Sequence, residues 1–224
     1  MQFTKVLDLT HPLEEGMLTF EASWHPRVSV QQLGRIGLEG RESRKLEIGT
    51  HTGTHVDSPL HFMSGGAGID ETSPKILLGE VSIVDFSHMK ENQVVPLSAM
   101  KKVPVTERMI LRFGWSKHWG TRKFYHGYPH LTVESARYLV EHGVKLLGYD
   151  IPSPDDSRIE LTPETLGTSV DSPVHKVFLS KGIALVEYLA NLDQIKELDG
   201  WHIVALPLKI TGADGSPARV LLFK

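Results

Sequence analysis

Residues 50–63 read T-H-T-G-T-H-V-D-S-P-L-H-F-M and place several metal-binding side chains close together. The segment contains three of the twelve histidines of the chain and one aspartate: His51, His55, His61 and Asp57. Imidazole and carboxylate groups are common ligands of zinc and similar divalent ions. A polar surface loop is the alternative, but the compact spacing H-x-x-x-H-x-D-x-x-x-H favours a metal site.

The backbone must bend if these side chains are to reach one ion. In an extended strand, which rises ~3.3 Å per residue, His51 and His55 would lie roughly 13 Å apart. Ligand atoms lie ~2.0–2.2 Å from a bound zinc ion, so two of them must nearly meet. Gly53 permits a bend, whereas the flanking threonines and Pro59 disfavour a helix. We therefore expect a strand end that kinks into a loop.

A second candidate region lies near the C-terminal end of the chain. Glu187 interrupts the apolar segment I-A-L-V-E-Y-L-A at residues 183–190. A buried, unpaired charge is costly, so this carboxylate is exposed at an edge, salt-bridged or buried beside a metal ion. Upstream, residues 171–181 predict a short helix that begins with capping residues and Pro173, with His175 in its first turn.

The sequence H-T-G-T-H-V-D-S-P-L-H-F is similar to the signature of the cyclase-like metal hydrolase family, which includes bacterial kynurenine formamidases and isatin hydrolases. The resemblance extends from about Val6 to Phe223, nearly the whole chain. It implies one α/β domain over residues 1–224, with a barrel-like core of mixed strands and flanking helices (the swivelling β/β/α type). It also implies a homodimer or homotetramer.

The resemblance further implies a binuclear site that holds Zn²⁺ or Mn²⁺. His51, His55 and Asp57 would hold the first ion. His175 and Glu187, within H-K-V-F-L-S-K-G-I-A-L-V-E, match the second metal pair of the family. They would hold the second ion, and Asp57 would bridge the two.

His61 is expected to be the catalytic residue. The matching residue of the family donates and accepts protons, a role that suits a side chain whose pKa lies near neutrality. A bound divalent ion lowers the pKa of its water toward ~7 and polarises a carbonyl oxygen. The expected chemistry is hydrolysis of an amide, a formamide or a strained lactam.

Two aromatic residues, Phe20 and Trp24, are candidates for substrate binding. Each is either a core residue or part of an aromatic wall for a planar substrate. This region resembles an aromatic-Pro-Gly-Asp turn of the family, but here Glu21-Ala22-Ser23 follows Phe20. Phe113 replaces the threonine of a Thr-Gly-Trp strand end. Because of these departures, the family resemblance does not identify the substrate. The neighbouring His25 is expected on the surface.

Three functions are compatible with these residues. The first is an arylformamidase that converts N-formylkynurenine to kynurenine and formate, a step of tryptophan catabolism. The second is hydrolysis of a cyclic amide, with isatin as the model, or of another carbonyl compound. The third is a non-catalytic metal-binding scaffold, which the intact set of ligands disfavours.

Periodicity predicts the elements that must position these side chains. We expect strands and helices in alternation, the clearest helix covering residues 131–142 with Thr132 as its N-cap. Predicted strands cover residues 3–9, 28–33, 44–48, 81–86, 108–115, 144–149 and 201–207, with a closing strand at the C-terminus, and a further short helix covers residues 97–102. Asp150 and Asp155 match the Gly-x-Asp-x-x-Ser-x-Asp pattern of the family, which implies a structural loop beside the active site. Asp214 is also expected to be structural.

Composition and charge exclude several classes of function. The chain has 224 residues, a formal net charge of −3 and no cysteine, so disulfides, thiolate metal sites and cysteine nucleophiles are excluded. Lysine and arginine are scattered, which predicts a small-molecule substrate and no nucleic-acid partner. No apolar run approaches the ~20 residues that span a bilayer, and the N-terminal residues show no secretory signal. We therefore expect no membrane partner and a cytoplasmic location.

Overall fold

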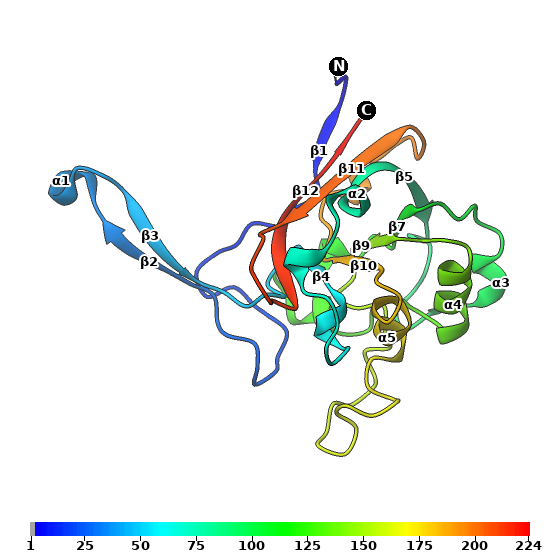
Figure 1. Cartoon of the computed structure of the whole chain (residues 1–224). Helices are drawn as coiled ribbons and strands as arrows, with labels where there is room; N and C mark the ends of the chain where they lie inside the picture. Colours follow the sequence, from blue (N-terminus) through cyan, green and yellow to red (C-terminus); the bar gives the residue numbers. More distant parts are fainter. Residues whose placement is uncertain (1–2) are drawn as a thin grey trace.

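A β-barrel forms the centre of the computed structural model, which describes residues 3–224 (Figure 1). Within these residues, an eight-stranded sheet has the order β1-β12-β11-β5-β7-β9-β10-β4, and an additional pairing of β4 with β12 closes seven of the strands into a ring. Its strands are β1 (Val6–Asp8), β4 (His55–Asp57), β5 (Leu78–Asp85), β7 (Arg108–Arg112), β9 (Leu146–Tyr149), β10 (Ala184–Glu187), β11 (Trp201–Pro207) and β12 (Gly215–Phe223).

The strand β12 is long enough to pair with two different strands along one of its edges. Its first residues pair with β4, and its last residues pair with β1. The opposite edge pairs with β11 along residues 218–223. The resulting α/β fold, with a barrel-like core of mixed strands, confirms the architecture predicted from the sequence.

The four central strands β5, β7, β9 and β10 run parallel to one another, and the two in the middle, β7 and β9, have consecutive buried apolar residues. Successive side chains of β7 enter different apolar clusters, since Met109 and Leu111 pack into one and Ile110 into the other. Apolar residues on both faces are typical of parallel strands covered on both sides. This explains why residues 108–112 and 146–149 lack the alternation of a half-exposed strand.

The helices of residues 3–224 are α1 (Ile36–Glu39), α2 (Pro74–Leu77), α3 (Leu97–Met100), α4 (Val133–Glu141) and α5 (Pro173–Leu179). Helices α3, α4 and α5 lie together on one side of the barrel, α2 lies beside β5 and β11, and α1 is at the tip of a projecting arm (Figure 1). The predicted N-cap of α4 is confirmed, because Thr132 Oγ1 accepts a hydrogen bond of 3.0 Å from the backbone N–H of Ser135. Residues 97–102 and 171–181 also form the expected helices, each a few residues shorter than predicted.

Short elements complete the chain around the barrel. Two further two-stranded sheets pair β2 (Ser29–Gly34) with β3 (Ser43–Glu47) and β6 (Val94–Val95) with β8 (His130–Leu131). The 3₁₀ turns are η1 (Pro59–His61), η2 (Ile69–Glu71), η3 (Ser116–His118), η4 (Arg122–Tyr125) and η5 (Leu192–Gln194). Among the helices of residues 3–224, none is long and apolar enough to cross a membrane.

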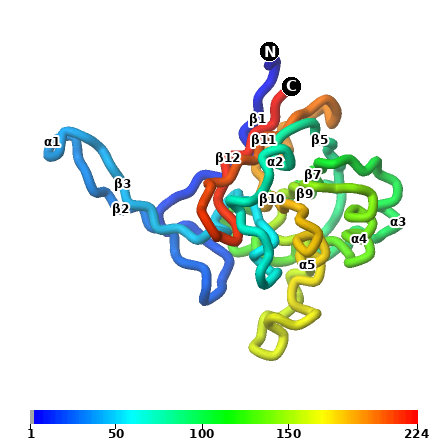
Figure 2. The backbone as a smooth tube through the Cα atoms, viewed as in Figure 1, coloured from blue at the N-terminus to red at the C-terminus, as the bar shows by residue number. Residues whose placement is uncertain are grey.

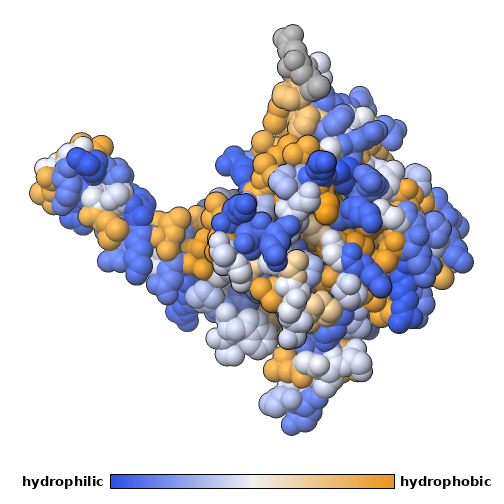
Figure 3. Space-filling model, in the orientation of Figure 1, coloured by the Kyte–Doolittle hydropathy of each residue, from blue (hydrophilic) through white to orange (hydrophobic). Residues whose placement is uncertain are grey.

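Residues 29–47, which we call the hairpin arm, project away from the barrel (Figures 1 and 2). The arm consists of β2, α1 at its tip, and β3. Apolar side chains lie exposed along it among charged ones (Figure 3): Leu33, Ile36, Leu38 and Leu46. The apolar side chains of this arm are exposed, and the arm has no buried core of its own. A two-stranded hairpin of this kind is only marginally stable alone in water.

Candidate metal centre

The short strand β4 brings the N-terminal ligands to the barrel. A turn precedes it, in which Gly53 has a φ of +63°, a conformation that favours glycine. The predicted strand end that kinks into a loop at Gly53 is confirmed, since β3 ends at Glu47 just before this turn. The short strand β4 that follows the turn was not predicted from the sequence. It forms because residues 55–57 pair with both β10 and β12 and close the barrel, so they must be extended.

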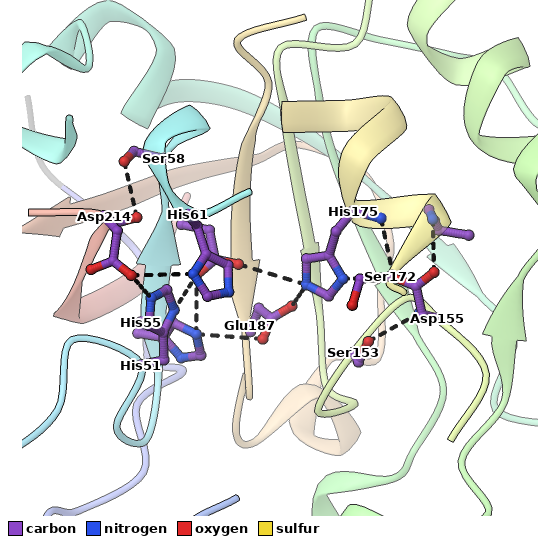
Figure 4. Close-up of polar contacts among 12 residues, drawn as sticks. His51, His55, Ser58, His61, Ser153, Asp155, Ser172, His175, Glu187 and Asp214 are labelled. Atoms are coloured by element: carbon purple, nitrogen blue, oxygen red, sulfur yellow. Dashed lines mark hydrogen bonds and ion pairs between the residues drawn. The ribbon is translucent and has the colours of Figure 1, made fainter. Parts of the chain in front are cut away.

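Strand pairing places Glu187 directly beside the His-rich segment. In the register between β10 and β4, Glu187 lies opposite His55. On its other side Glu187 contacts His175, which projects from the first turn of α5 (Figure 4). The side chain of Glu187 is buried and not at an exposed edge, which decides between the alternatives left by the sequence.

Six side chains, which we call the candidate metal centre, meet in this position: His51, His55, Asp57, His61, His175 and Glu187. Figure 4 labels all of them except Asp57. Four of them, His55, Asp57, His175 and Glu187, are only 1–6% exposed. All six were predicted from the sequence, and the fold brings all six together.

Asp57 lies between two groups of possible ligands. In the first group, His51 Nδ1 is 2.7 Å from Asp57 Oδ1, and the ring of His61 is 3.8 Å from that of His51. Within residues 3–224, ligand atoms of His51, Asp57 and His61 lie within 4.8 Å of one another.

The second group joins Asp57 to His55 and Glu187, whose ligand atoms also lie within 4.8 Å of one another. His55 Nε2 is 3.2 Å from Asp57 Oδ1 and 3.4 Å from Glu187 Oε2. His175 Nε2 adjoins this group, at 3.0 Å from Glu187 Oε1 and 3.7 Å from Asp57 Oδ2. The shared position of Asp57 suits a bridging carboxylate. The grouping differs from the predicted one, which placed His55 with His51.

In three of these histidines, the ring nitrogen that points away from the centre, here called the outer nitrogen, contacts an oxygen acceptor. His51 Nε2 is 2.8 Å from Asp214 Oδ2, and His55 Nδ1 is 2.7 Å from the carbonyl oxygen of Gly53. His175 Nδ1 is 2.6 Å from Asp155 Oδ2. Such contacts fix the tautomer and the ring orientation of metal-binding histidines. The other ring nitrogen of each histidine thereby faces the centre, where a cation would take the place of a proton.

Two buried atoms at the centre fit a metal ion. His55 Nε2 and Asp57 Oδ2 are enclosed and have no hydrogen-bond partner among the described residues. Buried polar atoms are normally paired, because leaving one unsatisfied costs about 1–3 kcal/mol. A divalent cation would satisfy both atoms, and nitrogen and oxygen donors suit Zn²⁺ and Mn²⁺ alike.

The electrostatics of the centre favour positive charge. Burial opposes ionisation of Asp57, but the neighbouring imidazoles of His51 and His55 hold its pKa well below its usual value. Burial likewise opposes protonation of His55, yet Asp57 and Glu187 raise its pKa to about 10. The pKa of His175 also rises, since Asp155 and Glu187 outweigh the effect of burial.

Two acidic residues that were expected to be structural contact the centre. Asp155 lies before α5, where it accepts hydrogen bonds from the backbone N–H groups of Val174 and His175 as well as contacting the His175 ring. Asp214 contacts His51 from the start of β12. The expected structural loop beside the active site agrees with the position of Asp155, and the contact of Asp214 with His51 does not contradict a structural role. Only the fold shows which histidine each of the two contacts. For Asp150 the structural role is confirmed, since its carboxylate accepts backbone N–H bonds from Phe113 and Trp115.

The aromatic candidates differ in their surroundings. Phe20 is half-buried, with its ring 6.4 Å from that of Tyr125 and 6.1 Å from that of His25. Trp24 is 56% exposed. His25 corrects an expectation, because it is half-buried and its ring lies 6.3 Å from that of His51. Substrate contact by Phe20 and Trp24 stays a prediction.

Two surface grooves lie elsewhere on the molecule. One, of about 510 Å³, runs between α4 and α5, and the other, of about 360 Å³, lies beside β6 and α3. Neither is lined by a residue of the candidate metal centre. The ligand geometry, and not the size of a cavity, therefore identifies the site.

Comparison with known proteins places this geometry in a family. The Cyclase family model matches residues 7–156. A kynurenine formamidase of Bacillus cereus is 30% identical to this chain, over 99% of this chain and 99% of its own length. The chain belongs to the cyclase family.

Solved structures agree with this membership. Isatin hydrolase A from Labrenzia aggregata, bound to benzyl benzoate, shares 25% identity with this cyclase-family chain at a TM-score of 0.82, covering 98% of this chain and 93% of that one. A predicted metal-dependent hydrolase from Bacillus stearothermophilus shares 27% identity at a TM-score of 0.74, covering 98% of each chain.

Proposed function

We propose that this cyclase-family protein is a metal-dependent hydrolase that cleaves the C–N amide bond of a small aromatic substrate. N-formylkynurenine, which would yield kynurenine and formate, is the leading candidate. The observation that carries the proposal is the buried centre in which Asp57 is shared by two groups of ligands. The similarity to kynurenine formamidases over nearly the full length of both chains supports the same reaction.

The residues of the centre would hold two divalent ions, either Zn²⁺ or Mn²⁺. His51, His55, Asp57, His175 and Glu187 would hold these ions, with Asp57 common to the two groups of possible ligands. When bound, such ions lower the pKa of water toward ~7 and polarise a carbonyl oxygen. Asp155 and the carbonyl of Gly53 would keep the ring nitrogens of His175 and His55 in the correct orientation.

His61 would carry the proton during hydrolysis. Its side chain is 23% exposed, against 1–10% for His55, His51 and His175, so it lies where a substrate can reach it. When water replaces nitrogen on the carbonyl carbon, the C–N bond breaks and the departing nitrogen needs a proton. A neutral histidine takes a proton from the attacking water and returns it to the leaving amine.

Hydrolysis of a cyclic amide of the isatin type is the second candidate. The similarity to isatin hydrolase A and the altered sequence Glu21-Ala22-Ser23 after Phe20 favour it. A non-catalytic metal-binding scaffold is the third candidate, and the presence of every predicted ligand argues against it.

Hydrolysis rates on two substrates decide among the three candidates. The protein is reconstituted with zinc or manganese, its metal content is measured, and N-formylkynurenine and isatin are compared. We expect kcat/KM of ~10⁴ M⁻¹s⁻¹ or above for the natural substrate class. Preference for isatin would select the second candidate. Bound metal without hydrolysis across a panel of amides and esters would select the scaffold.

We also propose that the protein assembles as a homodimer or homotetramer. The exposed apolar side chains of the hairpin arm support this proposal, since no other part of residues 3–224 covers them. The partner of the site is a small molecule. The cytoplasmic location and the absence of nucleic-acid and membrane partners stay predictions from the sequence.

A further inference from the structure

The backbone of Asp214 is held firmly beside the candidate metal centre. Its carbonyl oxygen accepts hydrogen bonds from Ser58, at 3.0 Å from the backbone N–H and 2.9 Å from the hydroxyl. The following residue, Gly215, pairs with Asp57 in the register of β12 and β4. A Cβ atom on Gly215 would lie 2.8 Å from Cε1 of His51, so the chain passes directly against this ring.

The side chain of Asp214 contacts two histidines with one oxygen atom. Oδ2 is 2.8 Å from Nε2 of His51 and 3.2 Å from Nδ1 of His61 (Figure 4). The two rings lie 3.8 Å apart, tilted by 30°. A carboxylate only accepts hydrogen bonds, so both of these nitrogens must carry hydrogen.

We infer that Asp214 is a positioning residue that couples a metal ligand, His51, to the proton carrier, His61. By accepting hydrogen from His51 Nε2, it leaves Nδ1 of that ring free to face Asp57 and a bound ion. By accepting hydrogen from His61 Nδ1, it leaves Nε2 of that ring as the nitrogen that exchanges a proton with the substrate. The kinetic part of this inference rests on the proposed hydrolase function.

The geometry separates this role from two simpler ones. A residue that only stabilised the fold would not need its carboxylate at the site, since the hydrogen bonds to Ser58 use the backbone carbonyl. A direct metal ligand would need an oxygen turned toward the group of Asp57. The described contacts of Oδ2 to histidines are to Nε2 of His51 and Nδ1 of His61, and the Asp214 side chain is 36% exposed. Asp214 belongs to neither group of possible ligands among the described residues.

The tautomer of His61 tests the inference independently of activity. Long-range ¹H–¹⁵N correlation spectra of the zinc-loaded protein, labelled at histidine and assigned with His61→Gln, report which ring nitrogen carries hydrogen. We expect hydrogen on Nδ1 in the unaltered protein and on Nε2 in Asp214→Ala. An unchanged tautomer in Asp214→Ala, or hydrogen on Nε2 in the unaltered protein, would overturn the inference.

Metal affinity separates a positioning residue from a ligand. Loss of an outer partner of a metal-binding histidine lowers affinity or activity by about 10–100-fold. We expect a loss within this range for Asp214→Asn, measured by zinc competition, and a much larger loss for His51→Ala. Equal losses in the two variants would make Asp214 a ligand and refute the inference. The exposed Asp199→Asn serves as the matched control and should bind zinc unchanged.

Kinetics on the substrate that the protein hydrolyses complete the test. General acid–base catalysis contributes about 10²–10⁴-fold, and we expect Asp214→Asn to lower kcat by about 100-fold with little change in KM. Residues that act as a unit are not additive, so the same substitution in His61→Ala should cost far less. A full 100-fold loss in both backgrounds would show that Asp214 does not act through His61. If the unaltered protein hydrolyses nothing, the proposed function fails, while the tautomer and zinc measurements still decide the role of Asp214.

Discussion

At the scale of single residues, the centre combines two atoms that lack a hydrogen-bond partner among the described residues, His55 Nε2 and Asp57 Oδ2, with histidine nitrogens held from outside. His55 shows this most simply, since its Nδ1 bonds the carbonyl of Gly53 while its Nε2 has no hydrogen-bond partner among the described residues. Glu187 is also oriented from outside, because the Tyr149 hydroxyl donates to its Oε1 at 2.7 Å. Each ligand therefore has a defined direction before any ion binds.

The first prediction concerns His61. His61→Ala should retain bound metal and lose about 10²–10⁴-fold in kcat, because it removes the proton carrier and spares the buried ligands. Metal analysis and steady-state kinetics on the same sample provide the measurement. His126→Ala, an exposed histidine, is the control and should behave like the unaltered protein. Loss of metal from His61→Ala would instead make His61 a ligand of the group that contains His51 and Asp57.

The second prediction concerns pH. Burial lowers the pKa of His55, but Asp57 and Glu187 raise it to about 10, so the metal-free protein keeps this proton at neutral pH. An ion must displace the proton, and its affinity should therefore rise as pH increases toward 10. The raised pKa also stabilises the metal-free fold fully below the unfolded value of ~6.5, a contribution lost as pH rises through about 10.

Zinc competition titrations at pH 6, 7 and 8 measure this dependence, with calorimetry in two buffers to count the protons released. The expected result is tighter binding at each step together with proton release. Affinity that does not change with pH would contradict the assigned state of His55.

At the scale of elements, β12 connects the barrel to the site. Its start lies against β4, and Gly215 leaves room there for His51. Only a residue without Cβ fits, since a Cβ would lie 2.8 Å from the imidazole and 2.9 Å from the carbonyl oxygen of Val56. Closure of the barrel and placement of a metal ligand thus depend on the same strand pairing.

The third prediction follows from this close approach. Gly215→Ala should destabilise the protein by about 1–3 kcal/mol and weaken metal binding, because a backbone atom cannot yield as a flexible side chain would. Urea unfolding of the metal-free protein gives the first quantity and zinc competition the second. Gly37→Ala is the matched control, since a Cβ there meets nothing within 4 Å. A stable Gly215→Ala with full zinc affinity would refute the argument.

At the scale of the whole molecule, the hairpin arm stands apart from the compact barrel (Figure 2). Ile36 and Leu38 at its tip are 73% and 74% exposed. Burial of apolar surface stabilises by about 25 cal/mol per Å², so covering such side chains in an assembly would be favourable. The proposed homo-oligomer is the simplest assembly that covers this arm.

The fourth prediction tests this assembly. Ile36→Asp combined with Leu38→Asp should reduce the oligomeric mass measured by light scattering, because charged side chains oppose burial of the tip. Gln31→Asp, an exposed polar position on the same arm, should leave the mass unchanged. Metal content per chain should stay constant, since the barrel holds the ligands. An unchanged mass in the double variant would exclude the arm from the interface.

Local sequence determined the ligand types and most elements. The H-x-x-x-H-x-D-x-x-x-H spacing indicated the N-terminal ligands, because residues so close along the chain can converge through one bend. Helix α4 was predicted with its cap, since capping uses neighbouring residues only. The short strand β4 after Gly53 was not predicted, because residues 55–57 are extended through pairing with the distant strands β10 and β12.

Tertiary structure alone decided how distant residues share the centre. The sequence left Glu187 exposed, paired or buried, and its register opposite His55 buried it. Asp155 and Asp214 gave no local sign of their contacts with His175 and His51, because a carboxylate in a loop has the same sequence pattern whether it binds its own backbone or a distant imidazole. Such long-range contacts arise only when the barrel closes and brings the ends of β4, β10 and β12 together.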